Sequence, residues 1–342
     1  MTGHTGHTGH TGHTGYRVGD VVEVLGAEEI LATLDENGEL DGMPFMPEML
    51  RFCGQRLTVA KVAHKLCDTI ERTGLRHLPD AVHLTGSRCD GSAHGGCQTA
   101  CLLYWKTAWL QKADGPAGDA PRPPARRAVD VEVLTERTRG EPFPDGSPRY
   151  ACQATEILRA APGRLPLKDL RQFTWDVRSG NNTVAETVRG VLIALFDKYQ
   201  SLSVRVLPSR LRLRGGRPWG FLRGRVTGPT PVAELGLKPG ELVRIRSKRE
   251  IELTLNERLQ NRGMGFEDGL TGFCGRTARV AGRVERCIDE TTGRMLEMKT
   301  PSVVLEDIVC PGTHSLNCPR GHLPFWREIW LERVDQTSQT RE

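Results

Sequence analysis

Two stretches of this chain alternate apolar and polar residues with the two-residue period of a β-strand, and they begin alike. Gly19-Asp20 opens the stretch at 21–24, and Gly240-Glu241 opens the one at 242–245. Further strands are predicted at 57–63 and 81–84, with counterparts at 278–284 and 302–305, and helices are predicted at 27–34 and 248–255. The pattern therefore describes the same succession of elements twice.

The segment between these two regions has a different pattern. A helix is predicted at 167–178, closed by Ser179-Gly180, and a second helix starts at the capping-box pair Thr183 and Glu186. Helical spacing places one set of apolar residues on a single face of the second helix: Val184, Val188, Val191, Leu192, Leu195 and Tyr199. Alternation of leucine and arginine then predicts a strand at 203–213.

The recurrence extends to individual residues, because 19–110 matches 240–331 at an offset of 221 positions. Paired tryptophans four apart, Trp105 with Trp109 and Trp326 with Trp330, predict helices at 101–110 and 322–331 whose indoles roof the core. We therefore interpret the fold as α+β. Two duplicated, small β-barrel-like modules, each ending in a Trp-bearing helix with a Cys-rich metal site, are joined by a helical and strand-containing central segment.

The predicted organisation has six parts. Module one spans 16–113 and module two spans 231–334, and a central α+β segment at 128–230 separates them. A Pro-rich linker is predicted at 114–127, and a polar tail at 335–342. The first part, 1–15, is a Thr-Gly-His tail that we expect to be disordered, and its imidazoles could scavenge a metal: His4, His7, His10 and His13.

The entrance to module two resembles that of a known class of small barrels. Leu235-Gly236-Leu237-Lys238-Pro239, followed by Gly240-Glu241, is similar to the start of SH3-like barrels of the KOW or ferrous-iron-transport-A type. This resemblance implies a small barrel for each module. The whole chain also resembles cysteine-rich bacterial proteins with two duplicated modules, a resemblance that implies no particular activity.

The composition is that of a globular protein, with 38% hydrophobic and 26% charged residues. No apolar run approaches the ~20 residues needed to span a bilayer, and the N-terminus lacks the layout of a secretory signal. We expect a cytoplasmic protein that does not contact membranes. In that reducing compartment, the ten cysteines are expected to be metal ligands or thiols rather than disulfides.

Most of the cysteines recur between the modules. The candidate ligands of module one are Cys53, Cys67, Cys89, Cys97 and Cys101, and those of module two are Cys274, Cys287, Cys310, Cys318 and His322. A thiolate and an imidazole both complete a tetrahedral zinc site but differ as packing groups, so the exchange of Cys101 for His322 indicates metal ligands. We expect two zinc ions, with two iron–sulfur clusters as the alternative. Zinc takes four ligands, so one residue of each five is surplus, and Cys67 is slightly favoured over Cys53 as the fourth ligand of module one.

Other residues carry weaker signals. His94 and His314 lie between the third and fourth cysteines of their modules, one position out of register, and are interpreted as loop histidines or as ligands of an open metal site. Cys152 has no counterpart and is expected to be a small core residue. No phosphate-binding loop, dinucleotide fingerprint or hydrolase motif is present, so the sequence leaves open whether the protein is an enzyme.

The net charge of +5 is concentrated in one stretch, because eight basic residues and no acidic residue lie between 198 and 232. This stripe is either a solvated strand face or a track for phosphates. Three functions compete: a metal-stabilised binding or adaptor protein with a protein partner, a two-centre iron–sulfur redox protein or metalloenzyme, and a nucleic-acid-binding protein using the Arg205–Arg225 stripe. The last alternative would use Arg210, Arg212, Arg214, Arg217 and Trp219.

Overall fold

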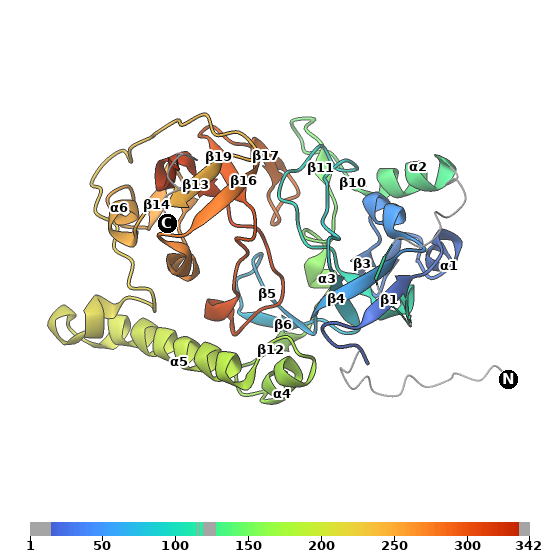
Figure 1. The fold of residues 1–342 in the computed structure, drawn as a ribbon, viewed down its shortest axis with the longest axis horizontal. Coiled ribbons are helices and arrows are strands. Elements are labelled where there is room, and N and C mark those ends of the chain that lie inside the picture. Colours follow the sequence, from blue (N-terminus) through green and yellow to red (C-terminus); the bar gives the residue numbers. More distant parts are fainter. Residues whose placement is uncertain (1–14, 114, 116, 119–127, 335–342) are drawn as a thin grey trace, which may run out of the picture.

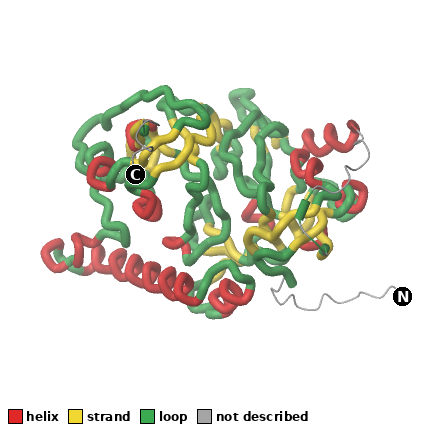
Figure 2. Tube along the Cα trace, viewed as in Figure 1, coloured by secondary structure: helices red, strands yellow, loops and turns green. Residues whose placement is uncertain are grey.

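The computed structural model describes residues 15–113, 115, 117–118 and 128–334. Nearly all of the predicted Thr-Gly-His tail, much of the linker at 114–127 and the whole tail at 335–342 lie outside the described residues. The fold is mixed α and β, with small sheets and few helices, and loops make up much of it (Figures 1 and 2).

The first module is built around a five-stranded antiparallel sheet of order β8-β7-β4-β1-β9. Its strands are β1 (Val21–Val24), β4 (Arg56–Val62), β7 (Ala81–Leu84), β8 (Trp105–Lys106) and β9 (Leu110–Lys112). The elements around it are α1 (Ala27–Leu31), β2 (Glu39–Leu40), β3 (Met43–Pro44), the 3-10 helix η1 (Pro47–Phe52), β5 (Lys65–Cys67) and β6 (Leu75–His77). The alternating apolar residues Val22 and Val24 of β1 point into its core.

The second module has a five-stranded sheet of the corresponding order, β20-β19-β16-β13-β21. Its strands are β13 (Leu242–Ile245), β16 (Thr277–Arg283), β19 (Ser302–Leu305), β20 (Trp326–Arg327) and β21 (Leu331–Arg333). Around it lie α6 (Lys248–Glu252), β14 (Gln260–Asn261), β15 (Met264–Gly265), η5 (Asp268–Phe273), β17 (Arg286–Ile288), β18 (Met295–Glu297), η6 (Thr313–Ser315) and η7 (Glu328–Trp330). The register of β4 against β7 shifts between Val59 and Lys61, and that of β16 against β19 shifts between Val280 and Gly282.

Neither sheet closes into a barrel within the described part of the chain, which corrects the barrel-like prediction. The strands β8 and β9 lie at opposite edges of the first sheet, and β20 and β21 lie at opposite edges of the second. One continuous segment supplies both edges of its sheet, because β8 and β9 are separated only by the 3-10 turn η2 (Thr107–Trp109). The described pairings leave the sheets open.

The predicted tryptophan-bearing helices at 101–110 and 322–331 are wrong, since each segment forms a strand, a 3-10 turn and a second strand. The two indoles of module one are nevertheless fully buried, and both pack edge-on against Phe45. Trp109 Nε1 donates to Thr33 Oγ1 at 3.0 Å, and Trp330 Nε1 donates to Thr254 Oγ1 at 2.9 Å. Backbone pairing with the sheet outweighs the helical spacing of these tryptophans.

The central segment contains the longest helix. Its elements are α2 (Ala128–Arg137), β10 (Arg139–Gly140), β11 (Arg149–Tyr150), α3 (Ile157–Ala160), β12 (Arg164–Leu165), α4 (Arg171–Arg178), α5 (Val184–Val206), η3 (Ser209–Leu211) and η4 (Leu213–Gly216). The capping box of Thr183 and Glu186 is confirmed at the start of α5. The strand predicted at 203–213 is wrong, because α5 continues to Val206 and ends just before Pro208, which cannot extend a helix.

The central segment joins the two modules. Strand β12 pairs with β6 of module one, and the Asn181 side chain bonds both the N–H and the carbonyl of Val62. Helix α5 packs against η6 of module two, and Figure 1 shows it along the lower edge of the molecule. Lys65 Nζ, which is fully buried, donates to Asp176 Oδ2 at 2.5 Å and to the carbonyl of Leu316 at 2.7 Å, so one ammonium group contacts all three parts.

None of the helices formed by the described residues combines the length and the apolar character that crossing a membrane requires.

Candidate metal centres

A loop rich in cysteine, glycine and histidine follows the third long strand of each module, and its ends are joined in the same way. The N–H of Cys89 donates to the carbonyl of Cys101, and the N–H of Cys310 donates to the carbonyl of His322, both at 2.9 Å. Inside each loop a glycine with positive φ lies against the backbone: a Cβ on Gly91 would stand 2.0 Å from the Cys97 carbonyl oxygen, and one on Gly312 would stand 2.3 Å from that of Cys318. Only glycine fits there, so these residues shape both loops.

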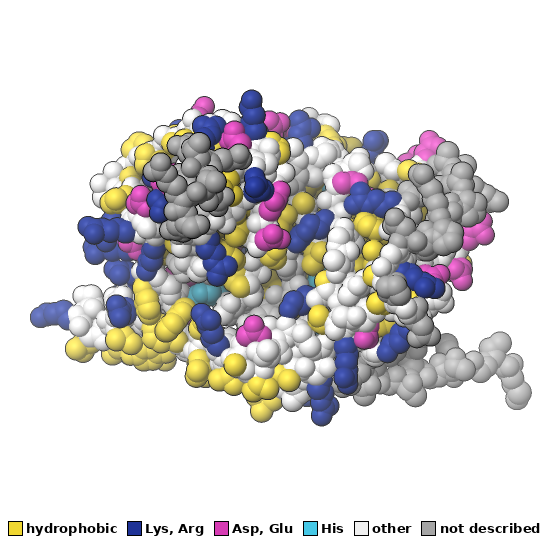
Figure 3. All heavy atoms as spheres, viewed as in Figure 1, with side chains coloured by type: hydrophobic (Ala, Val, Ile, Leu, Met, Phe, Trp, Pro, Cys, Tyr) yellow, Lys and Arg dark blue, Asp and Glu magenta, His cyan; other side chains and the backbone are white. Residues whose placement is uncertain are grey.

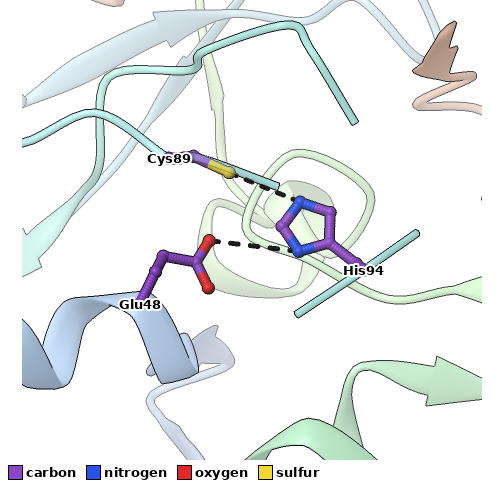
Figure 4. Close-up of side chains that lie close together, drawn as sticks. All are labelled: Glu48, Cys89 and His94. Atoms are coloured by element: carbon purple, nitrogen blue, oxygen red, sulfur yellow. Dashed lines mark hydrogen bonds and ion pairs between the residues drawn. The ribbon is translucent and has the colours of Figure 1, made fainter. Parts of the chain in front are cut away.

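In module one, three side chains of metal-ligand type converge beside this loop (Figure 4). His94 Nε2 lies 3.4 Å from Cys89 Sγ, and His94 Nδ1 lies 3.9 Å from Glu48 Oε1. Glu48 comes from η1, and it and His94 are only 6% and 1% exposed. Among the described residues, the Glu48 oxygens and His94 Nδ1 make no hydrogen bond to another nitrogen or oxygen, and the Glu48 carboxylate interacts with the Cys89 thiol. Buried polar atoms are usually hydrogen-bonded, so these three side chains form a candidate metal site.

The electrostatics of this group bear on which form of each side chain is favoured. Burial raises the pKa of the Cys89 thiol, and the nearby Glu48 carboxylate raises it further. Burial lowers the pKa of His94. Both shifts favour a neutral thiol and a neutral imidazole, which opposes the thiolate–imidazolium pair of a cysteine nucleophile. A bound metal ion favours the thiolate instead, because the charge of the ion stabilises it. The same ion binds the neutral form of an imidazole as a ligand.

Module two has a second group of the same three residue types: Glu267, Cys310 and His322. Glu267 is exposed, and the other two side chains are half-buried. Burial raises the pKa of Cys310 to about 11 and lowers the pKa of His322. At the repeat offset, Cys310 corresponds to Cys89, whereas His322 corresponds to Cys101 and Glu267 to Met46. The modules thus arrive at the same ligand types from different positions.

A cavity of about 410 Å³ lies between the modules, and both groups border it. Glu48, Cys89 and His94 line it from one side, and Glu267 and His322 line it from the other. Among the described residues, the other charged side chains that line it are Glu290 and Arg320, which form an ion pair at 2.6 Å. The rest of the wall is mostly apolar or bears thiols and small polar groups, which is typical of a small-molecule site.

Contacts across this interface come in corresponding pairs. The N–H of Cys67 donates to Cys318 Sγ at 3.0 Å, and the N–H of Ile288 donates to Cys97 Sγ at 3.4 Å. Cys67 corresponds to Cys287, and Cys97 corresponds to Cys318. The end of β5 in module one therefore contacts the cysteine-rich loop of module two, and the end of β17 in module two contacts the cysteine-rich loop of module one. The side chains of Cys67 and Cys318 are also hydrogen-bonded to each other, and this bond raises the pKa of Cys67 and lowers that of Cys318.

The ten ligands predicted from the sequence are spread over several environments. Cys89, Cys310 and His322 belong to the two groups described above, and Cys97 and Cys101 line the cavity beside the first. Cys67 contacts Cys318, Cys97 contacts the strand that carries Cys287, and Cys53 and Cys274 pack into the two hydrophobic cores. In the described part of the chain, the two groups of three that could hold a metal each contain a single cysteine.

The carboxylates Glu48 and Glu267 were not foreseen from the sequence. Glu48 has no counterpart in the repeat, because the equivalent position is Gly269. His94 did carry a signal, because it lies between Cys89 and Cys97, but its neighbour in the other module, His314, is occupied elsewhere. His314 Nδ1 lies 2.9 Å from Asp197 Oδ2 on α5.

The arginine stripe does not form the predicted strand face. Arg210 lies in η3, and Arg214 adopts positive φ in η4 with its guanidinium 5.2 Å from the Phe221 ring. Arg212 Nε donates to the Leu207 carbonyl. The Arg217 carbonyl accepts from Gln200, and Trp219 packs with Phe196 and Phe221. Nucleic-acid binding by these residues stays a prediction.

The chain matches none of the protein-family models, curated proteins or solved structures with which it was compared.

Proposed function

We propose that this protein binds two zinc ions, one at Glu48, Cys89 and His94 and one at Glu267, Cys310 and His322, and that both ions face the cavity between the modules. Each ion would have three protein ligands. Three ligands with an open fourth position are typical of zinc centres that bind or activate a small molecule, whereas structural zinc sites are closed by four.

One observation carries this proposal, namely the buried Glu48 carboxylate, which has no nitrogen or oxygen hydrogen-bond partner among the described residues and lies beside a thiol and an imidazole. Leaving a buried polar group unsatisfied costs on the order of 1–3 kcal/mol, and more for a charged group. A chain that places such a carboxylate against two other ligand types stabilises a cation there. A cation bound by the three side chains would offset that cost.

The mixed donor set favours zinc over the alternatives. Sulfur, nitrogen and carboxylate oxygen together suit a borderline-soft ion, whereas magnesium and calcium prefer oxygen alone. An iron–sulfur cluster is held mainly by thiolates, and each group here offers one. The two centres differ in burial, because Glu48 is enclosed and Glu267 is exposed, so we infer that they bind zinc with unequal affinity.

We further infer that the modules arose by duplication. Their sheets share one strand order, and their loops share the hydrogen bond from Cys89 to Cys101 and from Cys310 to His322. Joining two copies face to face creates the cavity at their interface, which neither copy encloses alone. This arrangement supports binding of a small molecule between two metal centres more directly than a role as a rigid adaptor.

The test is a zinc titration of the full-length chain against a chromophoric chelator. His4, His7, His10 and His13 are first changed to alanine, because the tail could bind metal independently. We expect two zinc ions per chain. Cys89→Ser and Cys310→Ser each reduce this to one, and so does His94→Asn.

Matched controls separate ligands from other cysteines. Cys53→Ser and Cys274→Ser alter cysteines of the two hydrophobic cores and are expected to leave two zinc ions bound. Circular dichroism checks that each variant is folded. Less than one zinc per chain in the parent, or equal losses from the control substitutions, would contradict the proposal.

A further inference from the structure

Helix α5 carries a row of exposed apolar side chains that nothing in the described chain covers (Figure 3, lower edge). Each is between 47% and 69% exposed: Val184, Val188, Leu192, Leu195, Tyr199, Leu202 and Val206. Single exposed apolar residues are common on protein surfaces, but a continuous row along a 23-residue helix marks an interaction surface.

The opposite face of α5 fixes this orientation. The buried residues of the helix are small or polar for the most part: Thr187, Gly190, Ile193, Gln200 and Ser203. A Cβ on Gly190 would lie 2.7 Å from Asn317 Oδ1, and Asn317 Nδ2 donates to the carbonyl of Glu186. Gln200 Nε2 donates to the carbonyls of Leu213 and Arg217. The apolar row cannot turn inward without breaking these contacts.

The spacing of the row is that of a coiled-coil seam. Leu192, Tyr199 and Val206 recur every seven residues, and Val188, Leu195 and Leu202 recur at the same interval, four residues ahead of them. These are the a and d positions of three heptads. A narrow a/d stripe fits a second helix, whereas a helix that lies on a membrane presents a wider apolar face.

The edges of the seam are basic. Arg189, Lys198 and Arg205 occupy the flanking e and g positions. The acidic residues of the helix are engaged elsewhere, because Glu186 binds Thr183 at the N-cap, and Asp197 accepts from the Trp219 N–H and contacts His314. A second copy of α5 would offer no acid to these cations. Charge complementarity therefore favours a partner helix with acidic flanks.

We propose that α5 docks an amphipathic helix of a partner protein that has apolar residues at heptad a and d positions and acidic residues at e and g. The two helices would pair along the length of α5, about 35 Å at the rise of an α-helix. This surface lies outside the cavity lining and does not depend on metal binding.

The probe is a synthetic peptide of about three heptads with leucine at a and d and glutamate at e and g. A second peptide has lysine at e and g and is otherwise identical. Fluorescence anisotropy measures binding of each labelled peptide to the full-length chain. We expect saturable binding of the glutamate peptide and binding at least tenfold weaker for the lysine peptide.

Substitutions on α5 locate the binding surface. Leu195→Asp and Leu202→Asp are expected to weaken binding of the glutamate peptide at least tenfold, whereas Ser201→Asp, exposed but off the seam, changes it less than threefold. All three positions face solvent, and circular dichroism verifies their folding. The comparison of the two peptides on the unaltered chain needs no variant.

Several results would overturn the proposal. They are absence of saturable binding by the glutamate peptide, equal binding of both peptides, and equal weakening by Ser201→Asp. A dimer of the chain that Leu195→Asp dissociates would assign the seam to a second copy. Binding to vesicles of anionic phospholipid that Leu195→Asp abolishes would assign it to a membrane surface.

Discussion

Changing Lys65 to methionine removes an ammonium group that contacts both modules and the central segment. Lys65 Nζ lies 2.5 Å from Asp176 Oδ2 and 2.7 Å from the Leu316 carbonyl oxygen, and both charged side chains are fully buried. Methionine keeps most of the length and apolar stem of lysine. The change therefore isolates the charge and its hydrogen bonds. The buried Asp176 then keeps the His64 imidazole at 3.2 Å.

The expected cost follows from that geometry. Removing one partner of a buried ion pair destabilises a protein by about 3–5 kcal/mol, because the other charge stays buried without compensation. Replacing both partners, as in Lys65→Met with Asp176→Leu, removes the uncompensated charge and is expected to cost far less than the single change. The two substitutions are therefore strongly non-additive.

A double-mutant cycle measured by urea unfolding tests this reasoning, with circular dichroism and tryptophan fluorescence as coincident probes. The matched control is Lys112→Met, because Lys112 is 65% exposed and lies 3.9 Å from Asp20. Such surface pairs contribute about 0–1 kcal/mol. A fall in the free energy of unfolding below about 1 kcal/mol for Lys65→Met, or additive effects of the two substitutions, would refute the conclusion that Lys65 and Asp176 form a buried ion pair.

Three further predictions follow from buried groups. Burial lowers the pKa of His83 to about 4, so the folded chain keeps this imidazole neutral while the unfolded chain protonates it below about pH 6.5. The free energy of unfolding therefore keeps its full value above about pH 6.5 and falls by roughly 1.4 kcal/mol per pH unit between pH 6.5 and pH 4. Urea unfolding of His83→Gln at several pH values should show a smaller fall in the free energy of unfolding toward pH 4. The same fall as in the parent chain would contradict a role of His83. Gly190→Ala should lower the free energy of unfolding by about 1–3 kcal/mol, because its Cβ would clash with Asn317. Adding Asn317→Ala should recover part of that loss. A Gly190→Ala variant as stable as the parent chain would contradict the packing of α5. Zinc at 1,000 times its dissociation constant should add about 4 kcal/mol of stability per site, measured by thermal unfolding. Cys89→Ser should reduce this zinc-dependent stabilisation, and Cys53→Ser should leave it unchanged. An unfolding temperature that does not rise with zinc would contradict binding to the folded state.

The strands β1 and β13 and the capping of α5 were predictable because they depend on local signals. Period-two alternation at 21–24 and 242–245 marks strands in both modules, and Thr183 with Glu186 marks the start of a helix. The tryptophan segments were not predictable in this way. Trp105 and Trp109 have helical spacing, but Trp105 pairs with Val82 of β7, and β9, which begins directly after Trp109, pairs with β1. Pairing between distant strands leaves no trace in a local period.

The candidate site was predictable only in part for a related reason. Cys89, Cys310 and His322 stand out because they recur or exchange at the same offset, whereas Glu48 and Glu267 lie some 40 residues away from the cysteines that they approach. Their roles depend on how η1 and the start of η5 fold against the loops. Likewise, the spacing of α5 identifies an apolar face but does not reveal that small and polar residues, rather than this face, pack against the protein.

The most direct test of the central claim is X-ray absorption of the zinc-loaded chain, with His4, His7, His10 and His13 changed to alanine. We predict one sulfur per zinc at about 2.3 Å, with the remaining ligands nitrogen or oxygen at about 2.0–2.2 Å. A Cys89→Ser variant that binds half as much zinc, with one sulfur per remaining zinc, would agree with one thiolate in each of two centres. Two or more sulfur ligands per zinc would contradict the Glu/Cys/His centres and return the ligand set to the recurring cysteines.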